Sequence, residues 1–425
     1  MKKLILIGAG MRGIRYTDIA AQMGDDFKVV AVAEPIDDRR NYIKKKHGIP
    51  DDMCFTSWEP LLALGRIADA ALICTMDRAH TAPALAAIEN GYDILLEKPM
   101  APTPEDCVKI ADAADKKGVK LLVCFVLRYA PFFKAVKRVI DEGKIGEVMS
   151  IHHIECVGNV HQSHSFVRGN WHNSEESSFM LLQKSSHDMD ILQWLAGKPV
   201  KRVSSFGALT YFKKENAPAN APERCIDGCP AADTCPYNAV KLYTQPDEIY
   251  KDWFPQSSTK KVDPTKEDII EMLHNSDYGK CVYKCNNDVV DHQVVNLEFE
   301  NSATASFNMS AFCLGDRSIR VMGTKGEVYG DMGENTITLY TFADKKTEII
   351  NYSDVVLEQS IAGGHGGGDE GIMQAFDKML VSGDAAVCDR ENTLDNHLVA
   401  FAAEESRLTG KIVDMKEFKQ RFKNK

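Results

Sequence analysis

Residues 3–13 read KLILIGAGMRG, and this stretch decides the fold of the first part of the chain. The aliphatic residues before the glycines predict a buried strand, and residues 14–23 have the apolar spacing of a helix. The glycines between them form a G-x-G-x-x-G pattern. In such a unit Gly8 makes the tight turn, Gly10 lets the backbone approach a ligand, and Gly13 lets the helix pack on the strand.

This strand–turn–helix unit predicts a dinucleotide site. Free N–H groups and the helix dipole favour phosphates at a helix N-terminus, so the glycine loop with Met11 and Arg12 is expected to hold a pyrophosphate. A second predicted strand ends at Glu34, 21 residues after Gly13, which is the distance at which a carboxylate binds the adenosine ribose. A carboxylate accepts hydrogen bonds from a free 2′-hydroxyl and repels a 2′-phosphate, so Glu34 favours NAD over NADP.

Two arginines bear on the same choice of cofactor. Arg39 and Arg40 follow Glu34 closely and could tolerate a 2′-phosphate. They lie in a predicted helix over residues 37–47, and we expect both to face solvent there. NAD therefore remains the favoured cofactor, with NADP as the alternative.

Strands alternate with helices through residue 126, which predicts an N-terminal Rossmann domain with a doubly wound parallel sheet over residues 1–126. Ligands bind at the carboxyl ends of such strands. Thr75 stands at one of these ends. His80 opens the next helix, where it either takes part in the site or only bonds to the backbone. The later predicted strands run over residues 28–33, 70–74, 94–96 and 120–126.

The strand within residues 93–100, DILLEKPM, ends in a charged pair. Pro99 restricts Lys98 to extended geometry, and Glu97 offers an adjacent carboxylate. Taken alone, the pair is either a solvated strand end or a lysine held at the edge where a cofactor binds.

From residue 127 the pattern changes to strands separated by few helices. This predicts a second, α+β domain over residues 127–425, with a largely antiparallel open sheet. An open sheet face suits the pairing of subunits, so we expect a homo-oligomer. The predicted strands run over residues 148–156, 200–211, 289–299, 303–310, 318–322 and 336–342.

One long helix is predicted within this domain, over residues 179–196. Gln183, His187 and Asp190 share one face of it, and Lys184 neighbours His187. A histidine among these groups can donate or accept a proton near neutral pH. The alternative is a helix with one solvated face.

Two loops of the second domain carry candidate ligand-binding residues. Asn170 and Trp171 offer a polar donor and an aromatic platform, a set that suits a sugar ring. The glycine-rich segment 363–369 carries His365 and could be a lid, a substrate wall or a connector. Asp369 is expected to cap the helix that follows it.

Residues 213–288 break the sheet pattern and read as a poorly hydrophobic insertion. The cysteines within this insertion either form a structural zinc site or remain unpaired thiols, because their spacing is not the usual Cys-x2-Cys. They are Cys225, Cys229, Cys235, Cys281 and Cys285.

The bulk properties exclude several classes of partner. The 425-residue chain has a net charge of −10, which argues against binding to nucleic acid or to an anionic membrane surface. No apolar run approaches the roughly 18 residues of a membrane span. The apolar stretch at the N-terminus is too short for a signal peptide and leads directly into the glycine motif, so we expect a cytoplasmic protein.

Together these motifs resemble the Gfo/Idh/MocA family of sugar and cyclitol oxidoreductases over nearly the whole chain. The E-K-P sequence of residues 97–99 is the most specific of them. The others are the glycines of the first turn, Thr75 with His80, Arg128 with Tyr129, His187 with Asp188 and Asp190, and His365 to Asp369.

The resemblance implies roles for several of these residues. Lys98 would lie beside the nicotinamide and the substrate, and His187 would be the acid/base. Many relatives have an aspartate four residues before the histidine, where this chain has Gln183. Further residues are expected to bind the cofactor (Thr75, His80, Glu97, Arg128) or the substrate (Tyr129, Asn170, Trp171, Lys184, His365).

The expected activity is an NAD-dependent dehydrogenase that oxidises a hydroxyl carbon of a sugar, glycoside or cyclitol. The first alternative is a redox-neutral glycosidase that retains its NAD through oxidation, elimination, hydration and reduction. The second is a non-catalytic NAD-binding sensor.

Overall fold

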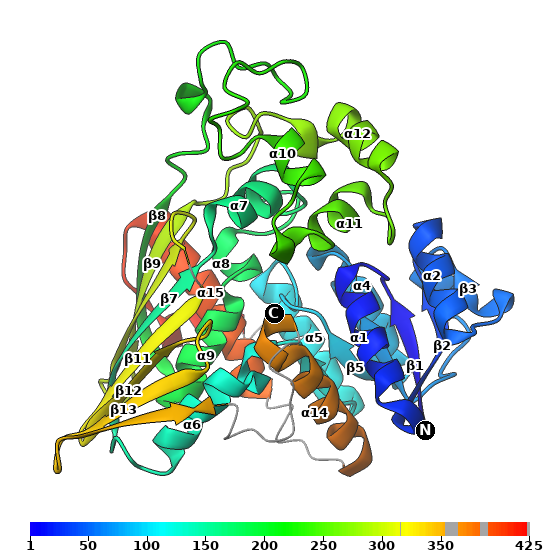
Figure 1. Cartoon of the computed structure of the whole chain (residues 1–425). Helices are drawn as coiled ribbons and strands as arrows, with labels where there is room; N and C mark the ends of the chain where they lie inside the picture. Colours follow the sequence, from blue (N-terminus) through cyan, green and yellow to red (C-terminus); the bar gives the residue numbers. More distant parts are fainter. Residues whose placement is uncertain (315, 353–363, 383–389, 423–425) are drawn as a thin grey trace.

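The computed structural model describes residues 1–314, 316–352, 364–382 and 390–422 (Figure 1). The first domain contains a six-stranded sheet with the order β3-β2-β1-β4-β5-β6, and every neighbouring pair is parallel. The strand order reverses between β1 and β4, so a ligand crevice is expected at the carboxyl ends of these two strands. The strands are β1 (Lys2–Ile7), β2 (Phe27–Ala33), β3 (Cys54–Phe55), β4 (Ala70–Ile73), β5 (Asp93–Leu96) and β6 (Leu121–Val123).

Helices cover both faces of this sheet, which explains why β1 is almost uninterruptedly apolar. Leu4 and Leu6 belong to the apolar cluster of one face, and Ile5 and Ile7 to that of the other. The predicted Rossmann domain is therefore confirmed. Its helices are α1 (Met11–Gln22), α2 (Asp37–His47), α3 (Trp58–Leu62), α4 (Thr81–Glu89) and α5 (Pro104–Lys117).

The second domain is built on a nine-stranded sheet with the order β14-β13-β12-β11-β7-β10-β9-β8-β15. Only the pair β7–β10 is parallel among these neighbours, so the predicted, largely antiparallel sheet is also confirmed. The strands are β7 (Val148–Cys156), β8 (Val200–Ala208), β9 (His292–Phe299), β10 (Thr304–Ser310), β11 (Arg317–Gly323), β12 (Gly326–Asp331), β13 (Thr336–Thr341), β14 (Lys346–Asn351) and β15 (Val413–Asp414).

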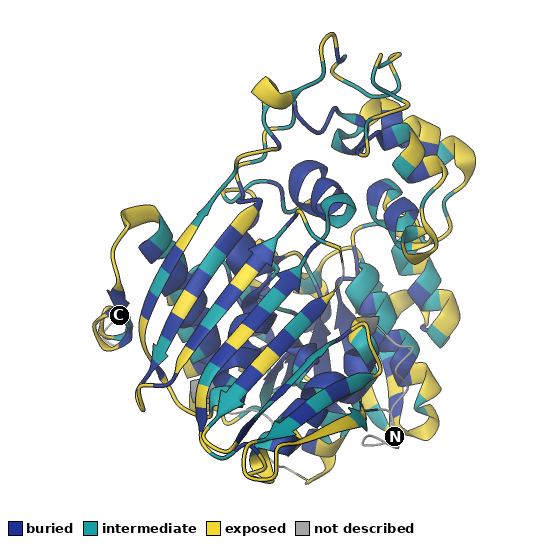
Figure 2. Cartoon of the chain, turned by 60° about the vertical axis from the view of Figure 1, so that its left-hand side comes forward, coloured by how far each residue is buried: buried dark blue, intermediate teal, exposed yellow. Residues whose placement is uncertain are grey.

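One face of this sheet packs on helices and the other is open (Figure 2). Buried and more exposed residues alternate along β9 and β10, as they do in an antiparallel sheet with a single core face. Sequence reasoning missed β12, β14 and β15. β14 is mostly exposed and β15 has only two residues. The helices of this domain are α6 (Pro131–Asp141), α7 (Asn159–Gln162), α8 (Met180–Gln183), α9 (Ser186–Ala196), α15 (Arg390–Thr409) and α16 (Met415–Gln420).

A late helix, α14 (Gly368–Ser382), returns to the first domain. Its residues Met373 and Phe376 are fully buried in the same apolar cluster as Leu4, and the rings of Phe376 and Phe27 stack with centroids 6.3 Å apart. Residues that precede this helix are thereby brought to the crevice between the domains.

The insertion is not the irregular loop that its composition predicts. It contains α10 (Ala239–Thr244), α11 (Trp253–Thr259) and α12 (Lys266–Asn275), which surround a small core of their own. The insertion rises above the crevice and reaches the first domain (Figure 1), where the N–H of Val262 donates to Asp38 at 2.8 Å. Within the described ranges, no helix is long and apolar enough to cross a membrane.

Candidate active site

The glycine loop leaves room for a ligand at one of its three glycines. A Cβ at Gly8, whose φ is +88°, would lie 2.7 Å from the main chain of Cys74, and one at Gly13 would lie 2.2 Å from the oxygen of Gly8. A Cβ at Gly10 would meet nothing closer than Arg39, at 4.0 Å. Among the described residues no side chain caps the N-terminus of α1, so its free N–H groups are available to an anion. This loop therefore fits a dinucleotide pyrophosphate.

Glu34 is buried at the end of β2. Its two carboxylate oxygens accept hydrogen bonds from the N–H groups of Ala9, at 2.6 Å, and Ile36, at 2.9 Å. Each oxygen keeps a second lone pair for a ribose hydroxyl. The expectation that Arg40 faces solvent is wrong, because its side chain folds back and donates to the carbonyl of Glu34 at 2.6 Å. Arg39 is also half-buried, and burial lowers its pKa.

His80 joins the ends of β4 and β5. Its ring nitrogens lie 2.8 Å from the carbonyl oxygen of Pro99 and 3.0 Å from that of Thr75. The ring is 1% exposed. Both ring nitrogens contact backbone carbonyls, which agrees with the alternative that His80 only bonds to the backbone. His80 therefore supports the turn that carries Lys98. The hydroxyl of Thr75 donates to the carbonyl of Ala79 at 3.0 Å.

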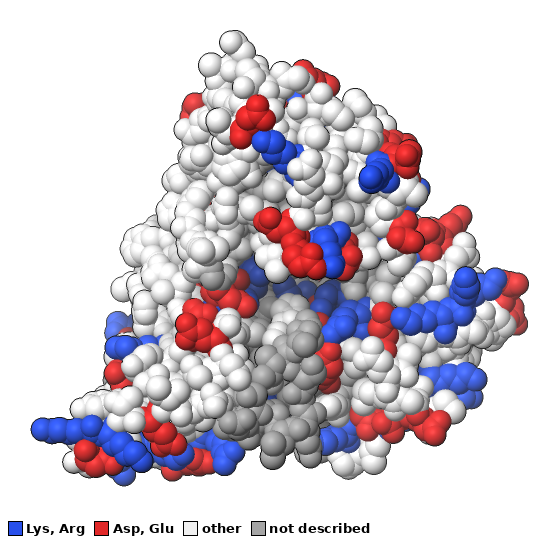
Figure 3. All heavy atoms as spheres, viewed as in Figure 1, with Lys and Arg blue, Asp and Glu red and all other residues white. Residues whose placement is uncertain are grey.

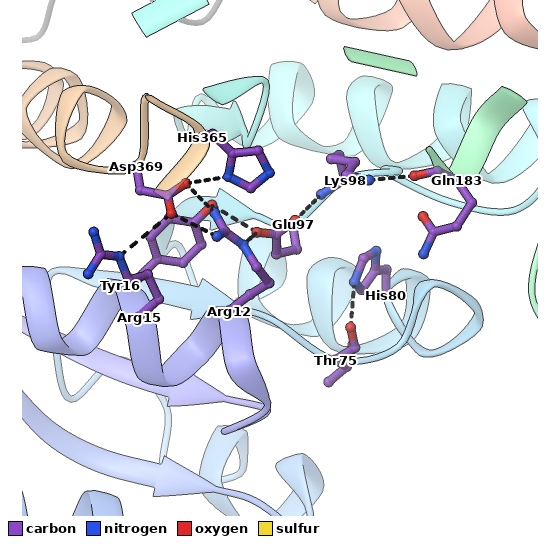
Figure 4. Close-up of polar contacts among 10 residues, drawn as sticks. All are labelled: Arg12, Arg15, Tyr16, Thr75, His80, Glu97, Lys98, Gln183, His365 and Asp369. Carbon is purple, nitrogen blue, oxygen red and sulfur yellow. Dashed lines mark hydrogen bonds and ion pairs between the residues drawn. The ribbon is translucent and has the colours of Figure 1, made fainter. Parts of the chain in front are cut away.

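Glu97 is held by an arginine rather than by the lysine beside it. It accepts hydrogen bonds from Arg12 Nε and from the hydroxyl of Tyr16, both at 2.8 Å, and from the N–H of Lys98 at 2.9 Å (Figure 4). Burial opposes ionisation of Glu97, but Arg12 outweighs it and lowers the pKa of this carboxyl. Arg12 also pairs with Asp369 at 2.7 Å.

Lys98 reaches across the crevice and donates a hydrogen bond to the main-chain carbonyl of Gln183. Burial lowers the pKa of Lys98 to about 8, and the positive charges of Lys184 and Arg12 act in the same direction, whereas Glu97 opposes them. Because this value is near neutral pH, both the protonated and the neutral amine are accessible to a reaction.

The helix that carries His187 is interrupted, so the prediction of one helix over residues 179–196 is wrong. α8 ends at Gln183 and α9 begins at Ser186. In an unbroken helix the carbonyl of Gln183 would accept from the N–H of His187. The break leaves that carbonyl to Lys98.

His187 lies at the start of α9 and is 3% exposed. Within the described part of the chain, its Nδ1 atom has no hydrogen-bond partner. Burial, and then the charges of Lys98 and His365, hold the pKa of His187 well below its usual value, so the ring is a neutral imidazole. The ring of His365 is 5.7 Å away.

His365 adopts a left-handed backbone conformation, with a φ of 52°. Its Nδ1 atom lies 3.0 Å from a carboxylate oxygen of Asp369. The prediction that Asp369 caps the helix is wrong: it lies within α14, and its side chain is directed at His365 and Arg12 instead. Gly363, the first residue of the predicted glycine-rich segment, lies outside the described residues.

The other predicted ligand-binding residues have different surroundings. Arg128 forms two hydrogen bonds of 2.6 Å with Asp190, so it anchors α9. Tyr129 packs against the core of the first domain. Asn170 approaches the sulfur of Met76 at 4.0 Å, and Trp171 is half-buried.

Sequence reasoning missed two of the charged residues beneath α9, Glu155 and Arg317. Arg317 pairs with Asp188 at 2.8 Å and also with Glu155, and Lys184 lies 3.2 Å from Glu155. The strand pattern could have revealed Glu155, because it lies an even number of residues after the buried Ile151 and therefore points to the same face of the sheet. The hollow between the domains shows Lys and Arg side chains along its floor (Figure 3).

A further missed residue is His161 on α7. Its ring meets that of Trp253, from the insertion, edge-on at 4.7 Å. Burial lowers its pKa well below the usual value, with Lys184 and Lys98 among the further causes.

The cysteines of the insertion give the zinc hypothesis no support. All five are free thiols. Among the residues that the structure describes, no three His, Cys, Asp or Glu side chains are grouped so that they could hold a metal ion.

Comparison with known proteins identifies both domains. A family model described as an oxidoreductase family with an NAD-binding Rossmann fold matches residues 2–125. A second, described as the C-terminal alpha/beta domain of that oxidoreductase family, matches residues 137–358.

The individual relatives have low sequence identity to this chain. The putative oxidoreductase YteT of Bacillus subtilis (strain 168) is 28% identical over 324 residues, which cover 71% of this chain and 70% of that protein. Inositol 2-dehydrogenase 2 of Saccharopolyspora erythraea is 31% identical over 133 residues, or 31% of this chain and 36% of the relative. A solved structure of levoglucosan dehydrogenase with NADH and levoglucosan has a TM-score of 0.71 at 18% identity, covering 97% of this chain and 99% of the other. This last likeness concerns the fold.

Proposed function

Because the chain belongs to the Gfo/Idh/MocA family of NAD(P)-dependent oxidoreductases, we propose that it is an NAD-dependent dehydrogenase acting on a hydroxyl carbon of a sugar, glycoside or cyclitol. The observation that carries this proposal is the contact between Lys98, at the end of β5, and the helix segment that precedes His187. It supports a single site to which the cofactor domain contributes the lysine and the second domain contributes the histidine.

Oxidation of an alcohol removes a hydride and a proton from one carbinol group. NAD held by the glycine loop and Glu34 would supply the hydride acceptor. His187 accepts the hydroxyl proton, which its neutral ring and unpartnered Nδ1 allow. Lys98 donates a hydrogen bond to the reacting oxygen and stabilises its developing negative charge.

The remaining residues of the crevice hold the substrate. Trp171 offers an aromatic face to a sugar ring, and Asn170 offers hydrogen bonds to its hydroxyls. Tyr129, Lys184 and His365 complete this set. The names of the relatives, which include inositol dehydrogenases and levoglucosan dehydrogenase, support a substrate of the sugar or cyclitol class.

A redox-neutral glycosidase is the second candidate, and one observation favours it. The insertion crosses from the second domain to the first at Val262 and Asp38, in the first turn of the helix that follows Glu34. A bridge at that place would hinder the exchange of NAD, and a glycosidase of this kind keeps its cofactor through each cycle.

One experiment separates the candidates. The protein is incubated with NAD and with free sugars, cyclitols and nitrophenyl glycosides while NADH and nitrophenol are both recorded. A dehydrogenase produces NADH, whereas the glycosidase releases nitrophenol without net NADH. Tight NAD binding without turnover on the whole panel contradicts both and favours a sensor.

A further inference from the structure

A buried row of charges runs beneath the start of α9 and ends at Lys184. Arg317, on β11, pairs with Asp188 at 2.8 Å and with Glu155 on β7. Glu155 Oε1 in turn lies 3.2 Å from Lys184 Nζ. Asp188, Glu155 and Arg317 are 0%, 2% and 4% exposed, whereas the side chain of Lys184 is 18% exposed. Lys184 is thus the end of the row that reaches the crevice.

Glu155 fixes the position of that end. A buried carboxylate requires cationic or hydrogen-bonding partners, and Glu155 has two cations, one on each side. Arg317 is itself held by Asp188, so it cannot follow a moving glutamate. A flexible lysine side chain is in this way tied to a rigid strand.

Lys184 is also close to Lys98. The carbonyl that accepts from Lys98 Nζ belongs to Gln183, the residue that precedes Lys184. The charge of Lys184 contributes to the lowered pKa values of Lys98, His187 and His161. One ammonium group therefore acts on Lys98 and on these two histidines.

We propose that Glu155 is a positioning residue that holds Lys184 beside Lys98, so that two ammonium groups face the reacting oxygen. Gln183 occupies the place at which the family resemblance leads one to expect a carboxylate. A carboxylate there would strengthen proton binding by Lys98, whereas the fixed ammonium group of Lys184 weakens it. The catalytic meaning of this inference rests on the proposed function, but the arrangement itself can be tested without turnover.

Several other groups act on Lys98 or are acted on by it, and all of them are retained in the variants below. They are Glu97, Arg12 on α1, Arg317 on β11, His187 on α9, His161 on α7 and His397 on α15. A change that follows replacement of Lys184 therefore reports the charge of Lys184.

The test measures the ionisation of Lys98 directly. Cyanate carbamoylates only neutral amines. The extent of Lys98 labelling is measured by peptide mass spectrometry at a series of pH values, with and without added NAD. The pH at which labelling is half-maximal is the ionisation midpoint of Lys98. In Lys184→Met the midpoint is expected to rise by roughly one pH unit. Lys184→Arg keeps the charge and should restore the wild-type value. Lys201→Met is the matched control, because Lys201 pairs with Glu298 at 3.4 Å far from the site.

A double-mutant cycle tests the part played by Glu155. In a Glu155→Gln background Lys184 is no longer tied to β7, so Lys184→Met should shift the midpoint by less than half as much as in the wild type. An unchanged midpoint in Lys184→Met, or an equal shift in both backgrounds, overturns the proposal. If the protein shows the expected shifts but turns over no sugar, glycoside or cyclitol, the pairing of Lys184 with Lys98 is supported and the proposed function is contradicted. Failure of the positioning proposal and failure of the proposed function are therefore distinguishable.

Discussion

Lys98 Nζ donates a hydrogen bond to the main-chain carbonyl of Gln183, and this contact connects the Rossmann domain to the helix segment that carries the candidate acid/base (Figure 4). It exists because α8 ends at Gln183 and α9 starts three residues later. A helix break and a strand end, 85 residues apart in the chain, thus form one site.

Replacement of Lys98 by methionine should reduce kcat by roughly 10³-fold, because the hydrogen bond to the reacting oxygen is lost. NAD affinity, measured by calorimetric titration, should change little, since the glycine loop is untouched. Lys116→Met, on the exposed side of α5, is the control. Near-normal turnover in Lys98→Met would contradict the role of this lysine.

The same variant should alter the pH dependence of stability. The pKa of Lys98 is about 8 in the folded protein and about 10.4 in an unfolded chain, so between these values the unfolded state binds more protons and stability rises with pH. Below pH 8 the buried charge carries its full penalty. Lys98→Met should therefore be more stable than the wild type at pH 7, and this advantage should shrink at pH 9.5. Thermal unfolding at the two pH values measures the difference, and a constant gap would refute it.

Asp188→Asn should destabilise the fold by roughly 3 kcal/mol, because it leaves the buried Arg317 with less compensation. The matched variant Glu298→Gln removes a carboxylate from an exposed pair with Arg202 and should cost less than about 1 kcal/mol. Urea unfolding of both proteins at pH 7 provides the comparison. Equal losses would show that the buried row is no more important to stability than a surface pair.

NAD should bind more tightly than NADP by roughly tenfold or more, which corresponds to about 1.4 kcal/mol. The reason is repulsion between a 2′-phosphate and the buried carboxylate of Glu34. Fluorescence titration with both cofactors decides the matter. Tighter binding of NADP would mean that Arg39, which lies near Gly10, recognises the phosphate.

The open face of the nine-stranded sheet should mediate the predicted pairing of subunits. An apolar side chain, Phe206 of β8, projects from it and is 63% exposed. Phe206→Glu should lower the mass measured by light scattering. Ile249→Glu, on the insertion, introduces the same charge at a residue that is 76% exposed and should leave the mass unchanged. A monomeric wild type would end this hypothesis.

Local patterns were sufficient to predict much of the molecule. The glycine turn, Glu34 and the E-K-P strand end depend on neighbouring residues, and the fold has them where periodicity and turn chemistry require. The break between α8 and α9 could not be predicted in this way. The residues on either side have helical spacing, and only the tertiary contact of Lys98 explains the use of the free carbonyl.

Local spacing was enough to predict the class of each sheet, the dinucleotide loop and the residue types available for proton transfer. The pairing of the charged side chains depends on the packing of the two domains. The tertiary structure assigned Glu97 to Arg12, Arg128 to Asp190, and Lys184 to Glu155. Charge pairing depends on distances between strands and helices remote in sequence, which only the packing of the two domains sets.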